Sequence, residues 1–277
     1  MEVQQSSLYA DYLRSLGWQT VKFDDSYIFI KRFPLLGTLA KAQRITKLPN
    51  PSKFFAFLHE YRVRRLAIEP DSIISEKKFF EWCQEFSKYC RLNSSPFLPT
   101  KTILINLAPT EEEIFKHFSE AKRRAVRRAQ KNHIVVRQSR DINTLIRTKN
   151  TSTGFLGFIT TYGITKLWRA FSPKRCTILL AYSAKSNSLP LGCVLLLFWD
   201  KIAYYWIAGA TKEGKKLFVP TLLVWESLRI AKKHGALQFD FVGAWDERLP
   251  KKNLEWKGFT KFKEGFGGSA KYYPIVQ

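Results

Sequence analysis

A cluster of basic side chains stands out among the residues that could do chemistry. Six of the eleven positions in 121–131 are Lys or Arg. On a helix, five of them would gather in stacked rows four residues apart: Arg123, Arg124, Arg127, Arg128 and Lys131. Like charges at this spacing repel each other, so a bound polyanion would offset the cost. Guanidinium groups favour bidentate phosphate contacts, which fits tRNA, DNA, a pyrophosphate or an anionic membrane; a solvated helix face is the alternative.

A second group of candidate residues lies near the end of the sequence. Asp240 falls within the strand-like run 239–242, just before a glycine, which is typical of a residue at a site opening or of a turn cap. Lys263 follows Phe262 and precedes Phe266, so we expect its ammonium between aromatic side chains. A desolvated lysine either loses its proton or binds an anion. Lys263 could therefore stabilise the oxyanion of an acyl transfer.

The cysteines and histidines argue against several other chemistries. The sequence has no CxxC pair, no HExxH motif, no GxSxG elbow and no GxxxxGK[ST] phosphate loop. A zinc site is therefore not expected. Scattered thiols without a secretory signal are typical of reduced residues in a cytosolic protein. The cysteines are Cys83, Cys90, Cys176 and Cys193, and the histidines are His59, His117, His133 and His234.

Composition and charge bound the class of protein. The 277 residues allow one large domain or two smaller ones, and 45% hydrophobic residues can bury a core. Forty-six Lys and Arg against 23 Asp and Glu leave a net charge of +23, which attracts nucleic acid, anionic headgroups or phosphorylated metabolites. The longest uncharged apolar run, 191–199, is short of the ~20 residues of a membrane span. With no apolar signal-like segment, we expect a cytoplasmic protein.

The elements that must position these residues alternate between helix and strand. In the first half we expect helices at 7–16, 54–61 and 75–89, and strands at 20–23, 26–31, 66–69 and 102–107. One long helix is predicted from Thr110 to about Asn132, with Thr110 and Glu113 forming a capping box. Its apolar face would be Ile114, Phe118, Ala121, Ala125 and Ala129.

The second half has a recognisable order of elements. A strand at 134–138 and a helix at 141–150 precede three strands that follow one another closely, at 176–182, 192–199 and 202–207. A helix then begins at Pro220 and ends at His234, before a buried strand at 237–242. This order is found in acetyltransferase-like (GNAT) domains, so the sequence predicts an α+β fold by analogy.

Several segments, taken in order, resemble the FemABX aminoacyltransferases, which build peptidoglycan interpeptide bridges. They are the basic helix running into 134–136, the expected turn 208–210, the loop to 218–220, and the segments 225–226, 239–243 and 262–267. Near the N-terminus, 16–22 resembles the opening segment of the family. The resemblance covers most of the chain and is densest over 121–268.

The resemblance implies a fold of two GNAT-like subdomains, each a mixed, largely antiparallel sheet flanked by helices. The first would span 1–133, completed by 268–277, and the second would span 134–267 and hold the acyl-transfer site. Family members move an amino acid from aminoacyl-tRNA onto a side-chain amine of a nucleotide-linked or lipid-linked cell-wall precursor, without metal or coenzyme. Both substrates are polyanions, which suits a strongly basic protein. The inner face of an anionic membrane is a further candidate partner.

The resemblance also implies roles for individual residues. Lys263, with the backbone next to Phe262, would lie at the tetrahedral intermediate, and Lys22 near the phosphates of the precursor. Asp240 could orient the attacking amine, or serve a structural role. The family's second phosphate-binding arginine has no clear counterpart here, and Lys166 is the nearest cation. The helical arm that some members place around tRNA is absent, which leaves the basic helix as the tRNA surface.

The sequence is also compatible with two other functions. A coenzyme A-dependent N-acyltransferase of the same fold needs a [QR]xxGx[GA] loop at a helix N-terminus. Segment 209–219 lacks that pattern, and the glycines of 265–268 do not precede a helical sequence. A non-enzymatic nucleic-acid-binding protein would use the basic helix, although no helix-turn-helix, zinc-finger or RNA-recognition signature accompanies it.

Overall fold

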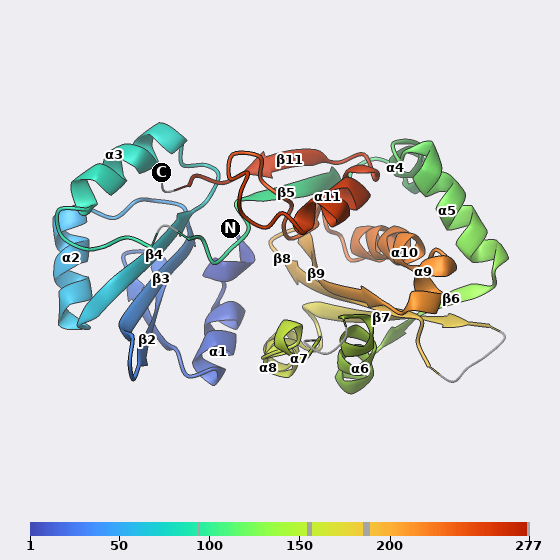
Figure 1. Ribbon diagram of the computed structural model, residues 1–277, viewed down its shortest axis with the longest axis horizontal. Coiled ribbons are helices and arrows are strands. Elements are labelled where there is room, and N and C mark those ends of the chain that lie inside the picture. Colours follow the sequence, from blue (N-terminus) through green and yellow to red (C-terminus); the bar gives the residue numbers. More distant parts are fainter. Residues whose placement is uncertain (94, 154–156, 185–188, 276–277) are drawn as a thin grey trace. The chain divides into compact units, whose positions relative to one another are not determined.

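The computed structural model describes residues 1–93, 95–153, 157–184 and 189–275. The chain divides into two compact units (Figure 1). Unit 1 comprises Met1–Thr102, Trp245–Lys252 and Lys271–Gln277, and unit 2 comprises Ile103–Ala244 and Asn253–Ala270. The first boundary between these units falls after Thr102. The sequence predicts a boundary between the two GNAT-like subdomains after residue 133, and this stays a prediction. The reason for the difference is that 103–133 packs into the core of unit 2.

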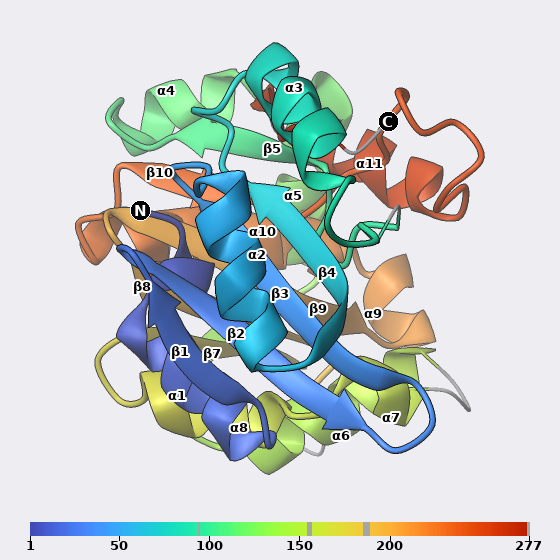
Figure 2. The same cartoon turned by 90° about the vertical axis from the view of Figure 1, so that its left-hand side faces the viewer.

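Unit 1 is built on a sheet of four described strands in the order β1-β2-β3-β4. They are β1 (Gln19–Phe23), β2 (Ser26–Phe33), β3 (Gly37–Ile45) and β4 (Val63–Pro70). The first three are antiparallel, and β4 pairs parallel with β3. The short helix η1 (Val3–Gln5), α1 (Ser7–Ser15), α2 (Pro51–Glu60) and α3 (Glu76–Phe86) complete the unit. Figure 2 shows α2 against β3 and β4, where Phe54 and Leu58 are buried in the core.

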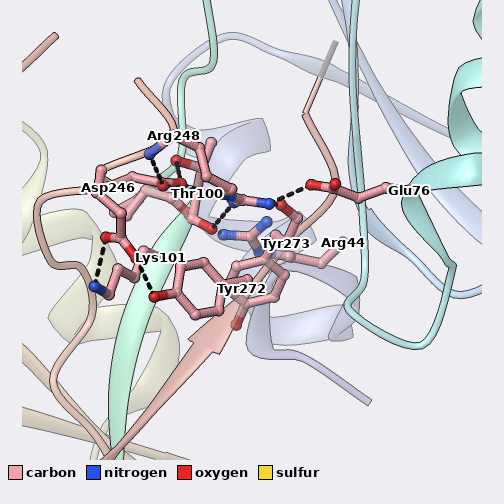
Figure 3. Close-up of polar contacts among 10 residues, drawn as sticks. Arg44, Glu76, Thr100, Lys101, Asp246, Arg248, Tyr272 and Tyr273 are labelled. Carbon is pink, nitrogen blue, oxygen red and sulfur yellow. Dashed lines mark hydrogen bonds and ion pairs between the residues drawn. The ribbon is translucent and has the colours of Figure 1, made fainter. Parts of the chain in front are cut away.

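A polar cluster in unit 1, the anchor network, ties residues 245–252 and 271–273 to the first segment of the chain (Figure 3). Arg248 donates to both carboxylate oxygens of Asp246, at 3.1 and 2.7 Å, and Thr100 donates to the same carboxylate at 2.6 Å. Arg248 also donates to the carbonyl of Tyr273 at 2.9 Å and pairs with Glu76. Burial opposes the charge of Asp246, but these hydrogen bonds outweigh it and lower the pKa of the carboxyl.

The second sheet contains seven described strands in the order β11-β5-β10-β9-β8-β7-β6. They are β5 (Lys101–Asn106), β6 (Ile134–Ser139), β7 (Cys176–Ser183), β8 (Gly192–Trp199), β9 (Ile202–Ala210), β10 (Gln238–Asp240) and β11 (Ser269–Tyr272). The run from β6 to β9 is antiparallel, which includes the three closely spaced strands of the prediction (β7, β8 and β9), and β10 is parallel to β9. The two mixed, largely antiparallel sheets flanked by helices confirm the predicted α+β class.

The helices of unit 2 cover this sheet (Figure 1). They are α4 (Glu111–Lys116), α5 (Glu120–Lys131), α6 (Ile142–Thr153), α7 (Gly157–Thr160), α8 (Ile164–Phe171), α9 (Lys212–Lys216), α10 (Val219–Lys233) and α11 (Trp256–Glu264). The core lies where α10 packs on β7, β8 and β9 and against α5, and it includes Leu223, Val194 and Phe239. In the part of the chain that the structure describes, no helix is long and apolar enough to cross a membrane.

The long helix predicted from Thr110 to Asn132 is wrong, because the chain forms two helices there. The capping box is confirmed: the Thr110 hydroxyl accepts from the Glu113 amide, and the Glu113 carboxylate accepts from Thr110. The helix ends at Lys116, and Ser119 caps a new helix by accepting from the Lys122 amide. The Ser119 amide itself donates to the carbonyl of Gly265 at 2.9 Å, a tertiary contact that the local sequence does not reveal.

The break also changes the apolar face of this region. Ile114, Phe118 and Ala129 are buried as predicted, but Ala121 is exposed and Ala125 only half-buried. Val126 is buried instead, because the new helix starts with a different rotation about its axis. The predicted face therefore holds only at its two ends.

Candidate active site

The site begins where two parallel strands separate. β10 pairs with β9 only from Gln238↔Ile202 to Asp240↔Tyr204, whereas β9 continues to Ala210. The predicted strand 237–242 is therefore too long, since Val242 turns the chain with a φ of 52°. A cavity of about 600 Å³ lies along the unmatched part of β9. Its size falls in the range of small-molecule sites.

Several elements contribute walls to this cavity. β9 lines it from Tyr205 to Ala210, and Phe241 and Val242 line it beyond the end of β10. Segment 208–210, which the sequence suggested as a turn, is thus part of a strand. The remaining lining residues come from six helices: Lys149, Thr160, Ile164, Lys215, Pro220, Leu223, Trp256, Phe259, Phe262 and Lys263. The cavity is therefore mostly aromatic and aliphatic, with three ammonium groups.

Lys263 on α11 is the cation that the structure holds most firmly at this cavity. Its Nζ donates to the carbonyl oxygens of Phe241 at 2.9 Å and Gly243 at 2.6 Å. The ring of Phe259 lies 4.9 Å from the same nitrogen. A protonated lysine has three N–H donors, so within the described part of the chain one donor remains for a ligand in the cavity.

The surroundings of Lys263 disfavour its charge. Burial lowers the pKa of its ammonium to about 8, and the nearby carboxylate of Asp240 opposes this shift. At neutral pH most Lys263 side chains therefore remain protonated. A cation desolvated in this way gains more than an exposed one from meeting negative charge.

The turn after β10 aims the two carbonyl groups at Lys263. Asp240 is buried at 4% exposure, and its carboxylate accepts from the Val242 amide at 2.6 Å. Val242 adopts the left-handed backbone region, which is rare for a β-branched residue and costs about 1–3 kcal/mol. Asp240 is not among the described residues that line the cavity. The structure therefore gives it a contact within the turn, and its role in orienting an amine stays a prediction.

The expectation that the Lys263 ammonium lies between aromatic side chains is confirmed, but its rings are Phe259, at 4.9 Å, and Phe241, at 5.8 Å from the centroid, and not Phe262 and Phe266. The ammonium over those rings belongs to Lys122 of α5, whose Nζ lies 3.6 Å from the centroid of Phe262 and 5.1 Å from that of Phe266. Adjacent residues of a helix point about 100° apart, so Lys263 cannot share the face on which 262 and 266 stack. Gly265 admits the Lys122 stem, since a Cβ there would lie 2.7 Å from Lys122 Cε.

Two cations of the cavity were missed at the level of sequence. Lys149 on α6 and Lys215 on α9 both line it, and burial lowers the pKa of Lys149, with a smaller contribution from the charge of Lys215. Gly209 lets α6 approach β9: a Cβ there would lie 2.5 Å from Ser152 Oγ and 3.0 Å from Lys149 Cδ. No spacing in the sequence connects 149, 209 and 215, because only the packing of α6 on β9 brings them together.

Two of the basic residues of helix α5 have partners within the chain that reduce the repulsion between its charges. Arg123 donates to the carbonyl of Lys116 at 2.8 Å and to that of Phe118, so it caps the end of α4. Arg124 pairs with Glu120 at 2.7 Å, one turn away. These contacts offset the repulsion that the sequence suggested a polyanion would relieve.

Arg127, Arg128 and Lys131 of α5 are exposed, whereas Lys122 is half-buried. The guanidinium of Arg127 lies 5.8 Å from the ring centroid of Phe115, and that of Arg128 lies 5.7 Å from that of Phe218. Lys131, in the last turn, is exposed as well. These three residues, together with the exposed side chain of Arg124, form the part of the helix that a polyanion can reach.

The two predicted phosphate-binding lysines lie outside the cavity lining. Lys22 is exposed on β1 in unit 1, with its Nζ 5.2 Å from the ring centroid of Tyr27. Lys166 is exposed on α8, two positions after Ile164, which lines the cavity. Of the predicted residues, the structure therefore brings Phe262 and Lys263 into one cavity, and places Asp240 in the turn beside them. Among the described residues, no group of three or more His, Cys, Asp or Glu is placed to hold a metal ion.

Comparison with known proteins gives the class of this fold and site. The sequence model of the family described as "Acetyltransferase (GNAT) domain" matches residues 116–258, more than half of the chain. The chain therefore belongs to that family, and its class is acyltransferase. None of the curated proteins compared with the chain matches it.

Solved structures extend the likeness over nearly the whole chain. The crystal structure of FemX aligns with a TM-score of 0.73 at 16% identity, over 98% of this chain and 90% of FemX. The C-terminal domain of a putative lysylphosphatidylglycerol synthetase from Agrobacterium fabrum aligns with a TM-score of 0.61 at 12% identity, covering 98% and 87%. L-PGS from Bacillus licheniformis follows with a TM-score of 0.57 at 13% identity, covering 97% and 86%. At these low identities the alignments show a shared fold. The predicted FemABX-like GNAT fold is confirmed.

Proposed function

We propose that this protein is an aminoacyltransferase that moves an amino acid from aminoacyl-tRNA onto an amine of a peptidoglycan precursor peptide. The observation that carries the proposal is the Lys263 ammonium, which two carbonyl groups hold at the wall of a 600 Å³ cavity. Support comes from the GNAT family, from the likeness to FemX, and from a net charge of +23 that attracts two polyanionic substrates.

The proposed reaction needs alignment and charge stabilisation more than a strong base. The amine nitrogen attacks the ester carbonyl carbon of the donor and forms a C–N bond. The carbonyl oxygen becomes negative in the tetrahedral intermediate, where the remaining N–H of Lys263 meets it. The intermediate collapses as the C–O bond to the ribose breaks, and the proton that leaves the amine ends on that ribose oxygen. Holding both reactants in the cavity supplies the rest of the acceleration.

The other cations have proposed roles toward phosphate. Lys149 and Lys215 face the same cavity and suit the phosphates of a charged tRNA end. Arg127, Arg128 and Lys131 on α5 would bind the body of the tRNA, while Arg123 and Arg124 would act mainly inside the chain. Lys22 and Lys166 remain the proposed contacts of the precursor phosphates. The proposed reaction uses no metal or coenzyme, and aminoacyl-tRNA is the co-substrate.

The test is a transfer assay with purified full-length chain. Mixed charged tRNA and a lipid-linked or nucleotide-linked precursor are incubated with the protein, and mass spectrometry of the precursor peptide identifies the added residue. Lys263→Ala should lower kcat/KM by about 10²–10³-fold, as loss of one oxyanion donor does. Lys122→Met is the matched control, since Lys122 has a similarly lowered pKa but does not line the described cavity.

Two outcomes would overturn the proposal. Unchanged turnover in Lys263→Ala would remove this residue from the mechanism. Binding of tRNA without transfer to any precursor, equal in the wild type and in Lys263→Ala, would instead favour a non-enzymatic nucleic-acid-binding protein.

A coenzyme A-dependent N-acyltransferase is the second candidate. The GNAT family match favours it, as does the cavity, which runs along β9 to Pro220 at the start of α10. Against it, α10 begins after Phe218 with no side-chain cap, and segment 209–219 lacks the glycine pattern that would hold a pyrophosphate. Calorimetry with acetyl-coenzyme A separates the two: tight binding would favour this candidate over aminoacyl-tRNA.

A further inference from the structure

An apolar patch borders the cavity on α7 and the turn that follows it. Phe158, Ile159 and Tyr162, the α7 patch, expose 60%, 58% and 74% of their surface. Thr160, which lies between them in the sequence, lines the cavity. Single exposed apolar residues are ordinary, but three within five positions beside a cavity mark an interaction surface.

The chain under the α7 patch is fixed to unit 2. Thr161 is buried, and its hydroxyl donates to the side-chain oxygen of Asn150 on α6 at 3.0 Å. Ile164 is buried and lines the cavity. Figure 1 shows α7 beside α6 and α8. The exposed side chains therefore project from an anchored segment.

Apolar side chains are also exposed on a second element of the cavity. Phe259 on α11 lines the cavity and is 37% exposed, and Leu254 just before that helix is 52% exposed. Both belong to unit 2, as the α7 patch does. The cavity is thus bordered by exposed apolar groups from two separate parts of the sequence.

The charged residues on either side of the α7 patch in the sequence all have one sign. The sequence from 142 to 175 holds six Lys or Arg and no Asp or Glu. Lys166 and Arg169 on α8 are exposed. Protein segments that bind the surface of an anionic membrane combine apolar side chains, which enter the interface, with basic side chains, which contact the headgroups. An acidic protein surface would pair with the basic residues, but it would not remove the three exposed apolar side chains from water.

We infer that the α7 patch docks this protein on an anionic lipid bilayer, with Phe158, Ile159 and Tyr162 entering the interface. Lys166 and Arg169 then contact the headgroups. Docking would place the cavity beside the membrane surface. Combined with the proposed function, and resting on it, this favours a lipid-borne acceptor over one that is free in solution.

Vesicle co-sedimentation of the full chain tests the docking. Vesicles of phosphatidylglycerol mixed with phosphatidylcholine are compared with phosphatidylcholine alone, at low salt and at roughly 0.5 M salt, where exposed charges are screened. The triple variant Phe158→Ser, Ile159→Ser, Tyr162→Ser should bind the anionic vesicles about tenfold more weakly or worse. The difference in vesicle binding between the wild type and the triple variant should be largest at high salt, where the charges are screened and only the insertion of apolar side chains still contributes.

A matched control removes equally exposed apolar groups elsewhere. Leu35 and Leu36 in unit 1 are 97% and 63% exposed, so Leu35→Ser, Leu36→Ser should bind vesicles as the wild type does. Thermal unfolding should be unchanged in both variants. Should the triple variant fail to fold, Ile159→Ser and Tyr162→Ser made singly carry the same comparison.

Three results would overturn the inference. Equal vesicle binding by the triple variant and the wild type would leave only non-specific attraction of a basic protein. Equal binding of the wild type to neutral vesicles would remove the role of the cations. If the wild type is a dimer, the triple variant is a monomer and both bind vesicles equally, the patch is an interface between two copies of the chain. The vesicles contain no donor and no acceptor, so failure here is separate from failure of acyl transfer.

Discussion

The anchor network of unit 1 and the cavity of unit 2 both place a cation against backbone carbonyl groups. Arg248 donates to the carbonyls of Thr100 and Tyr273, but it also has Asp246 and Glu76 as carboxylate partners. Lys263 donates to two carbonyls, and the charge of the nearby Asp240 carboxylate opposes the lowering of its pKa. The first cation has two carboxylate partners in the folded protein, whereas the second lines a cavity that a ligand can enter.

This contrast separates a structural charge from a chemical one. A pKa lowered by burial is not enough, because the pKa of Lys122 is also lowered to about 8 by burial, over the rings of Phe262 and Phe266. What distinguishes Lys263 is its place in the lining of the cavity. Substitutions should therefore divide into those that cost stability and those that cost rate.

The largest effect is expected in the anchor network. Asp246→Ala leaves Arg248 partly buried without its bidentate partner, so the free energy of unfolding should fall by about 3–5 kcal/mol in denaturant titration. Asp11→Ala is the control: its pair with Arg14, also in unit 1, is exposed on both sides, at 52% each, and should contribute about 0–1 kcal/mol. A smaller effect than in the control would mean that the network does not stabilise unit 1.

Lys263→Met should show the opposite pattern. The barrier to acyl transfer should rise by about 2.7–4 kcal/mol, while the free energy of unfolding stays equal or increases, because a desolvated charge has been removed. Single-turnover kinetics and denaturant titration on the same preparation measure both. A variant that loses stability in proportion to its rate would make Lys263 a structural residue.

The pH dependence of rate sharpens the comparison between the two lysines. If the protonated form of Lys263 stabilises the oxyanion, kcat/KM should fall as pH rises through about 8, by about tenfold per unit above it. The fall should persist in Lys122→Met and disappear in Lys263→Met. A rising limb at the same pH would indicate that the neutral amine acts as a base.

Stability should change in the opposite direction over the same range. The pKa of Lys263 is about 8 in the folded protein and about 10.5 when unfolded, so the unfolded state binds more protons between these values. The free energy of unfolding should therefore increase from pH 8 toward 10.5. Lys122 contributes a similar increase, and only the variant lacking both lysines should lose it.

The smallest effect is expected on the exposed helix. Arg127→Gln with Arg128→Gln should weaken tRNA binding several-fold and reduce the salt slope by ~0.7–0.9 for each phosphate that is no longer neutralised. Arg124→Gln, which removes a residue already paired with Glu120, should change the slope less. Equal slopes in all three proteins would exclude α5 from the tRNA surface.

Much of the fold was predictable because it follows from local patterns. The capping box of Thr110 and Glu113, the antiparallel run of β7 to β9 and the helix that begins near Pro220 each depend on residues that are close to one another in the sequence. Such patterns act through backbone geometry, so they hold whatever packs around them. The α+β class and the GNAT order of the second half followed from these elements.

The site could be predicted only in part. Lys263 was found because its neighbours are aromatic, yet the sequence pattern suggested the wrong rings for it. The break at Ser119 was missed because its cause, a bond to Gly265, comes from a segment more than a hundred positions away. Lys149 and Lys215 had no signal at all, since an isolated lysine at the surface of a helix looks the same in sequence whether or not it lines a cavity.

The amino-acid sequence by itself determined the +23 charge, the types of the elements and the presence of a lysine among aromatic residues near the C-terminus. Only the tertiary structure decided which lysine stacks on Phe262 and which faces the cavity. The physical reason is that a helix sets the relative directions of its own side chains, while its rotation against the sheet is set by contacts with distant segments.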